Sequence, residues 1–217
     1  MKKIFLLAPA LAFLFSCNNN ETSTTTTSEK QDAMNASGEQ YNIDSSSVII
    51  WKASKPTGRH TGIFKIQEGV VTIMDGNIKG GNFIINMASL TNQDLVGDAE
   101  NKAKLEGHLK SPDFFDVAKY PTSRFEITSM KPYKADSSNT MAGATHIIKG
   151  NLTLKDSTKN VSFPAKVTMD SKSLTASGNF DIDRTAWGLN YKGPNNPQDW
   201  FISKTVNISL AISASKK

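Results

Sequence analysis

The stretch that decides the fold is VSFPAKVTMDSKSLTASGNFDID, which covers residues 161–183. Apolar or small side chains occupy every second position over residues 161–169, and they do so again over residues 174–182. Alternation with a period of two is typical of a strand with one apolar face and one solvated face. Residues 170–172, Asp-Ser-Lys, have the composition of a turn. The stretch therefore predicts two antiparallel strands joined by a hairpin.

The same alternation recurs in the rest of the domain, at residues 82–87, 148–155 and 206–212. Turn-forming residues at 75–77 and 155–157 separate further strands, and such short connections imply antiparallel hairpins. About eight strands with one apolar face form either a sandwich or a closed barrel. Closure is favoured because it removes exposed strand edges. The sequence thus predicts an all-β antiparallel domain, with a β-barrel as the favoured architecture.

Residues 105–130, LEGHLKSPDFFDVAKYPTSRFEITSM, interrupt the strands. Leu105 and Leu109 lie on one helical face, and Pro112 ends the helix because proline disfavours helical geometry before it. We predict a short helical excursion over residues 92–110, after which the chain returns to a strand at residues 124–128. Two adjacent rings, Phe114 and Phe115, follow the helix. Neighbouring side chains in a turn point in different directions, so at least one of the two rings should contact an apolar surface.

The N-terminus has the order of a secretory signal peptide. Lys2 and Lys3 precede an apolar run over residues 4–15, which is too short to span a bilayer as a permanent helix. Cys17, the only cysteine, follows directly, and the segment resembles a bacterial lipobox. The resemblance implies that residues 1–16 are removed and that Cys17 carries the lipid. Several acyl chains on one residue give stable anchoring, so we expect a protein of the bacterial cell envelope, attached at the periplasmic face or the outer membrane.

Residues 17–40 are expected to form a disordered tether behind the lipidated Cys17, because they contain almost no apolar side chains. The globular domain then spans residues 41–217. Loss of Lys2 and Lys3 lowers the formal charge from +5 to +3, which is too low to indicate nucleic-acid binding. A single cysteine excludes an internal disulfide, so a hydrophobic core must stabilise the fold.

Catalytic motifs are absent from the sequence. It contains no G-x-S-x-G, no H-E-x-x-H and no G-x-x-x-x-G-K-[ST]. His60, His108 and His146 are far apart in the chain, so no metal site is expected; His108 is interpreted as a hydrogen-bonded structural residue. Close carboxylates such as Asp181 and Asp183 are explained by solvated faces, and Asp183 can form a local ion pair with Arg184. We predict that the protein is not an enzyme.

Ten apolar side chains form either the wall of a tunnel or a solid core. On pattern alone the solid core is somewhat favoured, because most aromatic residues in strands serve packing. Small residues on the apolar faces, at 150, 165, 176 and 178, favour a cavity instead. The ten candidates are Phe64, Phe83, Ile85, Phe114, Phe115, Phe125, Leu152, Phe163, Phe180 and Trp187.

An ordered set of short stretches resembles one family. The stretches are YNID at 41–44, GIFK at 62–65, HLKSPDFFD at 108–116, YP at 120–121 with RF at 124–125, GNLTL at 150–154, VSFP at 161–164 and DRTAWG at 183–188. On these the chain is identified as a member of the YceI-like family of bacterial envelope proteins, over residues 41–212. The resemblance implies an extended lipocalin-like barrel whose lumen accommodates a long polyisoprenoid chain.

This resemblance favours the tunnel over the solid core. It implies a membrane-tethered carrier or storage protein for an isoprenoid lipid, such as an isoprenoid quinone or a prenyl lipid, with no covalent cofactor. Arg124, Asn190 and Tyr191 are candidate donors to a polar head group at the tunnel mouth. The alternatives are a solid-core envelope protein that binds a protein partner through its outer surface and an enzyme that acts on a lipid. Formation of a homodimer is left open.

Overall fold

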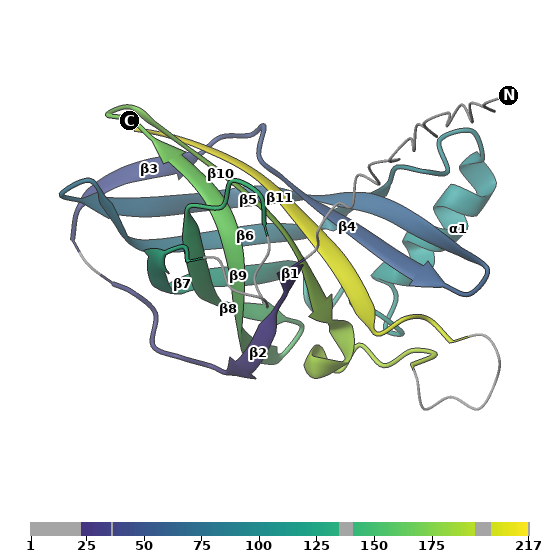
Figure 1. Cartoon of the computed structure of the whole chain (residues 1–217). Coiled ribbons are helices and arrows are strands. Elements are labelled where there is room, and N and C mark those ends of the chain that lie inside the picture. Colours follow the sequence, from purple (N-terminus) through teal and green to yellow (C-terminus); the bar gives the residue numbers. More distant parts are fainter. Residues whose placement is uncertain (1–22, 36, 135–140, 194–200, 217) are drawn as a thin grey trace, which may run out of the picture.

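The barrel predicted from the strand pattern is present. A computed structural model describes residues 23–35, 37–134, 141–193 and 201–216, so residues 1–16 and Cys17 lie outside the described residues. Figure 1 shows a closed, elongated antiparallel barrel with one helix at its end. In the described part of the chain, no helix combines the length and the apolar character that crossing a bilayer requires.

From the second barrel strand onward, each strand pairs with the next along the chain. The barrel strands are β3 (Glu39–Ile43), β4 (Val48–Lys55), β5 (Gly58–Met74), β6 (Asn77–Asn92), β7 (Thr122–Pro132), β8 (His146–Leu154), β9 (Ser157–Met169), β10 (Ser173–Asp183) and β11 (Thr205–Lys216). β3 and β4 both lie between β5 and β11, so they share one position and the barrel has eight. Pairing of the last strand, β11, with β3 and β4 closes the ring.

The predicted hairpin turns are confirmed. Asp75 and Gly76 join β5 to β6 with φ values of 52° and 69°, and two successive positive φ values match the twist of the flanking strands. Lys155 opens the turn between β8 and β9 with a φ of 55°. Each turn depends on a few consecutive residues, so local composition was sufficient to predict it. The turns also fix the register of the strands that they join.

The helix is shorter than predicted. α1 spans Ala99–Lys110 and begins at Asp98, whose side chain accepts a hydrogen bond from the Asn101 backbone N–H. Such a cap satisfies a donor that has no partner within the first turn. The seven residues before Ala99 are not helical, and Val96 among them is 74% exposed. The start predicted at residue 92 is therefore wrong.

Apolar packing closes one end of the barrel. Tyr41, Val71, Ile73, Leu174 and Ala214 form a buried cluster there. The Tyr41 hydroxyl donates a hydrogen bond of 3.1 Å to the backbone carbonyl of Ser171 in the hairpin between β9 and β10. At the opposite end lie α1, the hairpin between β4 and β5, and the 3₁₀ helix η1 (Arg184–Trp187). We call this second end the mouth of the barrel.

The described part of the predicted tether is not disordered. β1 (Ser23–Thr24) pairs with β10 and β2 (Thr26–Glu29) pairs with β9. β9 and β10 pair with each other only over residues 165–169 and 174–178. The N-terminal segment, residues 23–35, thus lies along the barrel wall where these two strands separate (Figure 1).

Two buried amides hold the N-terminal segment. Asn151, which is 1% exposed, accepts from the Gln31 backbone N–H at 3.0 Å and donates to the Gln31 backbone carbonyl at 2.7 Å. Asn160 donates to Thr128 Oγ1 at 2.9 Å and to Asn151 Oδ1 at 3.1 Å. The recognition is directed at main-chain atoms, so the polar composition of the segment did not reveal it.

Replacing Asn151 with alanine is expected to release the N-terminal segment. The change removes both bonds to Gln31 and leaves buried polar groups without partners, at a cost of about 2–3 kcal/mol in the free energy of unfolding. Urea unfolding measures that loss, and trypsin cleavage after Lys30 should become faster. Gln93→Ala removes an exposed amide and should change neither quantity. Equal cleavage rates in the two variants would contradict the proposed attachment.

Candidate functional site

An apolar cavity of about 500 Å³ lies inside the barrel. Its lining residues extend from Leu174 at the closed end to Lys55 at the mouth. The volume falls within the range of roughly 300–1,000 Å³ that is typical of small-molecule sites. The interior is therefore not a solid core, which was the interpretation favoured by residue pattern alone.

Nine of the ten predicted lumen residues line this cavity. They are Phe64, Phe83, Ile85, Phe114, Phe115, Phe125, Leu152, Phe163 and Phe180. Trp187 does not: it is 1% exposed and packs as part of η1, where its indole Nε1 donates to the Leu152 carbonyl at 2.8 Å. Its placement in the lumen was wrong because a residue in a 3₁₀ turn does not follow strand alternation. Contact of the other nine with a ligand stays a prediction.

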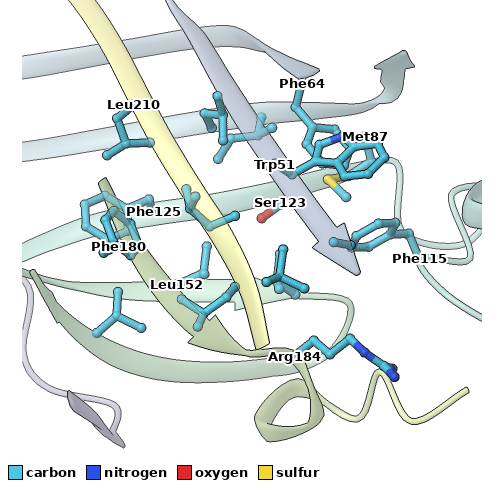
Figure 2. Close-up of a pocket in the computed structure, with 18 of the residues that line it drawn as sticks. Trp51, Phe64, Met87, Phe115, Ser123, Phe125, Leu152, Phe180, Arg184 and Leu210 are labelled. Carbon is cyan, nitrogen blue, oxygen red and sulfur yellow. The ribbon is translucent and has the colours of Figure 1, made fainter. Parts of the chain in front are cut away.

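Two groups of rings form opposite walls. Figure 2 shows Trp51, Phe64 and Phe115 on one side, and Phe125 and Phe180 on the other. Phe64 and Phe115 meet edge to face, with centroids 5.6 Å apart and an interplanar angle of 88°. This geometry is favourable for aromatic pairs. Phe115 therefore completes the wall.

The neighbouring ring, Phe114, has different partners. Its centroid lies 5.2 Å from that of His108 and 5.2 Å from that of Tyr191. The adjacent rings thus do point in different directions, and Phe114 connects the end of α1 to the chain that follows η1.

Small residues contribute less space than expected. A Cβ at Gly150 would lie 2.1 Å from Phe125 Cζ, so that ring fills the room beside the glycine. Of residues 150, 165, 176 and 178, Ala176 alone borders the cavity. Space beside a small residue remains empty only if no side chain of a neighbouring strand fills it. The sequence does not show which side chain lies there.

The mouth carries basic side chains. Lys55, His60, His108, Arg184 and Lys192 line the cavity there, and none of its described lining residues is Asp or Glu. The mouth therefore has a positive character.

The two histidines of the mouth each have a carboxylate partner just outside the lining. His60 Nδ1 lies 2.8 Å from Asp94 Oδ2, and His108 Nε2 lies 3.0 Å from Asp113 Oδ2, which agrees with the interpretation of His108 as a structural residue. Burial alone would raise the pKa of Asp94, but hydrogen bonds from Thr61, His60 and Asn92 lower it below its ordinary value. Within the described ranges, no group of three or more His, Cys, Asp or Glu could hold a metal ion.

Arg184 organises the chain at the mouth. It is 4% exposed, and its guanidinium donates to the carbonyl of Leu189. It also donates to Tyr191 at 3.1 Å, Ile202 at 2.9 Å and Ser203 at 3.0 Å. Burial lowers the pKa of this guanidinium, and the charge of the preceding aspartate opposes the effect. Figure 2 shows the side chain leading away from the cavity centre.

The local ion pair suggested for Asp183 and Arg184 is not what the structure contains. Asp183 instead caps η1 by accepting from the Thr185 backbone N–H at 3.0 Å, and it lies 3.3 Å from Lys204 Nζ. Arg184 is free to bind carbonyls because Asp183 has these other partners. The motif DRTAWG at residues 183–188 thus located these two side chains in the chain, but it did not show which hydrogen bonds they form.

Only one of the three predicted head-group donors lines the cavity. Arg124 is on the outer surface, where it donates to Asn82 Oδ1 at 2.9 Å. The reason is alternation along β7: Ser123 and Phe125 line the cavity, so Arg124 points outward. Asn190 is not a lining residue, whereas Tyr191 is, and its ring meets His108 edge to face at 4.7 Å.

Three further residues that were not among the predicted candidates line the cavity: Trp51, Met87 and Ser123. Trp51 is 6% exposed. The alternation of residues 48–55, with Trp51 on the apolar face, was the signal that could have found it.

The sequence and the fold match known proteins. A family model for the YceI-like domain matches residues 41–214. The chain belongs to the YceI-like family. A UPF0312 protein of Azotobacter vinelandii is 38% identical over 72 residues, 33% of either chain. One of Photorhabdus laumondii is 30% identical over 113 residues, 51% of this chain and 50% of that one. The chain thus matches between a third and a half of the length of these relatives.

Two solved structures share the architecture. The crystal structure of BcnA from Burkholderia cenocepacia aligns with a TM-score of 0.60 at 19% identity, covering 79% of this chain and 99% of that one. A polyisoprenoid binding domain from Saccharophagus degradans, implicated in plant cell wall breakdown, aligns with a TM-score of 0.59 at 15% identity, covering 82% and 98%. At such identities the likeness concerns the fold.

Proposed function

We propose that this YceI-like protein holds a polyisoprenoid lipid in its barrel and serves as a carrier or store for it. The observation that carries the proposal is the apolar cavity, closed by the Tyr41 cluster at one end and lined by exposed Lys55 at the other. Burial of apolar surface stabilises a complex by roughly 25 cal/mol per Å², so a prenyl chain needs few polar contacts. The shared fold of the polyisoprenoid binding domain from Saccharophagus degradans supports the same ligand class.

The proposal includes attachment to a membrane of the bacterial envelope through a lipidated Cys17. Five residues lie between Cys17 and Ser23, where pairing with β10 begins, and the six Cα–Cα steps that join the two residues span at most about 20 Å. Ser23 lies beside Phe180, three residues from the end of β10 at the mouth, a distance of about 10 Å along the strand. A lipid at Cys17 would therefore keep the mouth within reach of the bilayer, which suits the uptake and release of a lipid.

Native mass spectrometry of the protein purified from its own host tests the ligand. A bound mass that fragments as an isoprenoid is expected, together with loss of that mass when the protein is mixed with empty vesicles. A barrel that is empty and that refuses added isoprenoid would contradict lipid binding. A protein that binds another envelope protein through its outer surface would instead be recovered with that partner and without lipid.

Replacing Cys17 with alanine is expected to abolish incorporation of labelled fatty acid and to move the protein from the membrane fraction to the soluble envelope fraction or to its uncleaved precursor. The physical reason is that the thiol is the acylated group and no second cysteine exists in the sequence. Ser16→Ala, which keeps the thiol, is the matched control. Labelling that persists without Cys17 would contradict this anchor.

A further inference from the structure

The indole of Trp51 carries a buried hydrogen-bond donor without an acceptor. Trp51 is 6% exposed and lines the cavity, and its Nε1 has no hydrogen-bond partner in the part of the chain that the structure describes. Leaving a buried polar group unpaired costs about 1–3 kcal/mol. A buried tryptophan usually has a partner for this N–H, so the unpaired N–H of Trp51 requires an explanation.

Trp187 provides the internal comparison. Its side chain is also buried, at 1% exposure, but its Nε1 donates to the Leu152 carbonyl at 2.8 Å, and the residue does not line the cavity. The donor that faces the protein is thus satisfied by the protein. The unsatisfied donor belongs to the indole on the cavity wall, shown beside Phe64 and Met87 in Figure 2.

The position of the Trp51 ring is built into the wall. Trp51 on β4 pairs with Gly62 on β5, and a Cβ at Gly62 would lie 2.3 Å from Trp51 Cζ2 and 2.5 Å from Cε2. Only a residue without a side chain permits the indole to lie this close to the strand. The contact with Gly62 therefore fixes the place of the ring against the wall.

The surroundings of Trp51 are neutral. The cluster around it consists of Phe64, Ile85, Met87 and Leu90, with Phe115 packed against them. Lys55 and Lys192 lie at the mouth. An ionised phosphate beside the indole would have a single donor in an apolar environment, where an unpaired charge is strongly disfavoured. A neutral ligand oxygen beside the indole, by contrast, carries no charge and can be satisfied by the single N–H of Trp51.

From these contacts we infer that the Trp51 indole N–H is a specificity-determining donor for a neutral oxygen of the bound lipid, a quinone carbonyl or a phenol or ether oxygen. The inference rests on the proposed function and narrows its ligand class. The barrel discriminates against isoprenoid hydrocarbons of equal size, because only an oxygen-bearing ligand satisfies the donor.

Two probes test the inference on the whole chain: menaquinone-4, a naphthoquinone with a prenyl tail, and squalene, an isoprenoid hydrocarbon. Trp51→Phe keeps an aromatic ring and removes the donor. It is expected to weaken menaquinone-4 binding about tenfold and to leave squalene binding unchanged. In the wild type, the infrared stretch of one quinone carbonyl should move to lower frequency on binding, and Trp51→Phe should remove that shift.

Trp187→Phe is the matched control, because it removes an indole N–H outside the cavity. It should lower the free energy of unfolding and leave the ratio of the two affinities unchanged. Gly62→Ala, which pushes the Trp51 ring from its place, should reduce that ratio as Trp51→Phe does.

An unchanged affinity ratio in Trp51→Phe, or an unshifted carbonyl band in the wild type, would overturn the inference while lipid binding itself stands. A wild-type protein that binds neither probe would overturn the proposed function together with it. The infrared measurement on the wild type does not depend on how any variant folds.

Discussion

Arg184→Met is expected to lower the free energy of unfolding by about 3–5 kcal/mol, the cost of breaking a buried charged network. The guanidinium donates to four backbone carbonyls, at residues 189, 191, 202 and 203. Methionine matches the length of the stem but supplies no donor, so these carbonyls lose their charged partner. Chemical denaturation followed by tryptophan fluorescence measures the loss.

The mouth should change together with stability. The segments that Arg184 joins carry Tyr191 and Ile202, both of which line the cavity. Amide hydrogen exchange at residues 189–193 and 201–203 should therefore become faster in Arg184→Met.

Arg124→Met is the matched control for this prediction. Arg124 lies on the outer surface, where its side chain is 48% exposed and 3.0 Å from Glu126. Exposed ion pairs contribute about 0–1 kcal/mol, so the same substitution there should have a small effect. Equal losses at the two positions would show that burial of Arg184 does not carry the stability assigned to it.

Ala176→Phe is expected to abolish binding of a long isoprenoid while the barrel still folds. Ala176 lines the cavity on β10, and a phenyl group added there occupies space that the ligand needs. The substitution extends into an existing cavity, so its effect on the free energy of unfolding should stay below about 1 kcal/mol, less than the 1–3 kcal/mol typical of overpacking. Isoprenoid binding and thermal unfolding of the same preparation measure both effects.

Thr175→Phe places the same ring on the exposed face of β10 and should leave lipid binding intact. A solid core predicts the opposite pattern for Ala176→Phe, with strong destabilisation and no specific effect on a ligand. Retained isoprenoid binding in a folded Ala176→Phe protein would show that the ligand does not occupy this part of the lumen.

Alternation and turn chemistry predicted most of the fold. Residues 161–183 form the hairpin of β9 and β10 as expected, because period-two burial and turn conformation are both local properties. The sequence favoured a barrel over a sandwich, but local pattern did not decide between the two. The choice depends on whether the last strand meets the first, and pairing of β11 with β3 and β4 supplies that answer.

Most of the cavity wall followed from the same alternation, since apolar faces of strands turn inward in a closed barrel. The failures have identifiable causes. Arg124 was assigned to the mouth although the alternation along β7 places it outside. Trp187 was assigned to the lumen wall although it lies in η1. Trp51 was overlooked although the alternation of residues 48–55 places it on the apolar face, and sequence gives no sign that its Nε1 lacks a partner.

The sequence by itself determined the strands, the hairpins and the apolar faces, because each depends on neighbours within a few positions. The tertiary structure alone decided that residues 23–35 lie along the wall, since their partner Asn151 binds the main-chain N–H and carbonyl of Gln31, 120 positions away. It also decided that Phe125 fills the space at Gly150, that Arg184 gathers carbonyls at the mouth, and that Trp51 keeps an unpaired donor. These features depend on which strands meet across the barrel, and composition does not encode distances between strands.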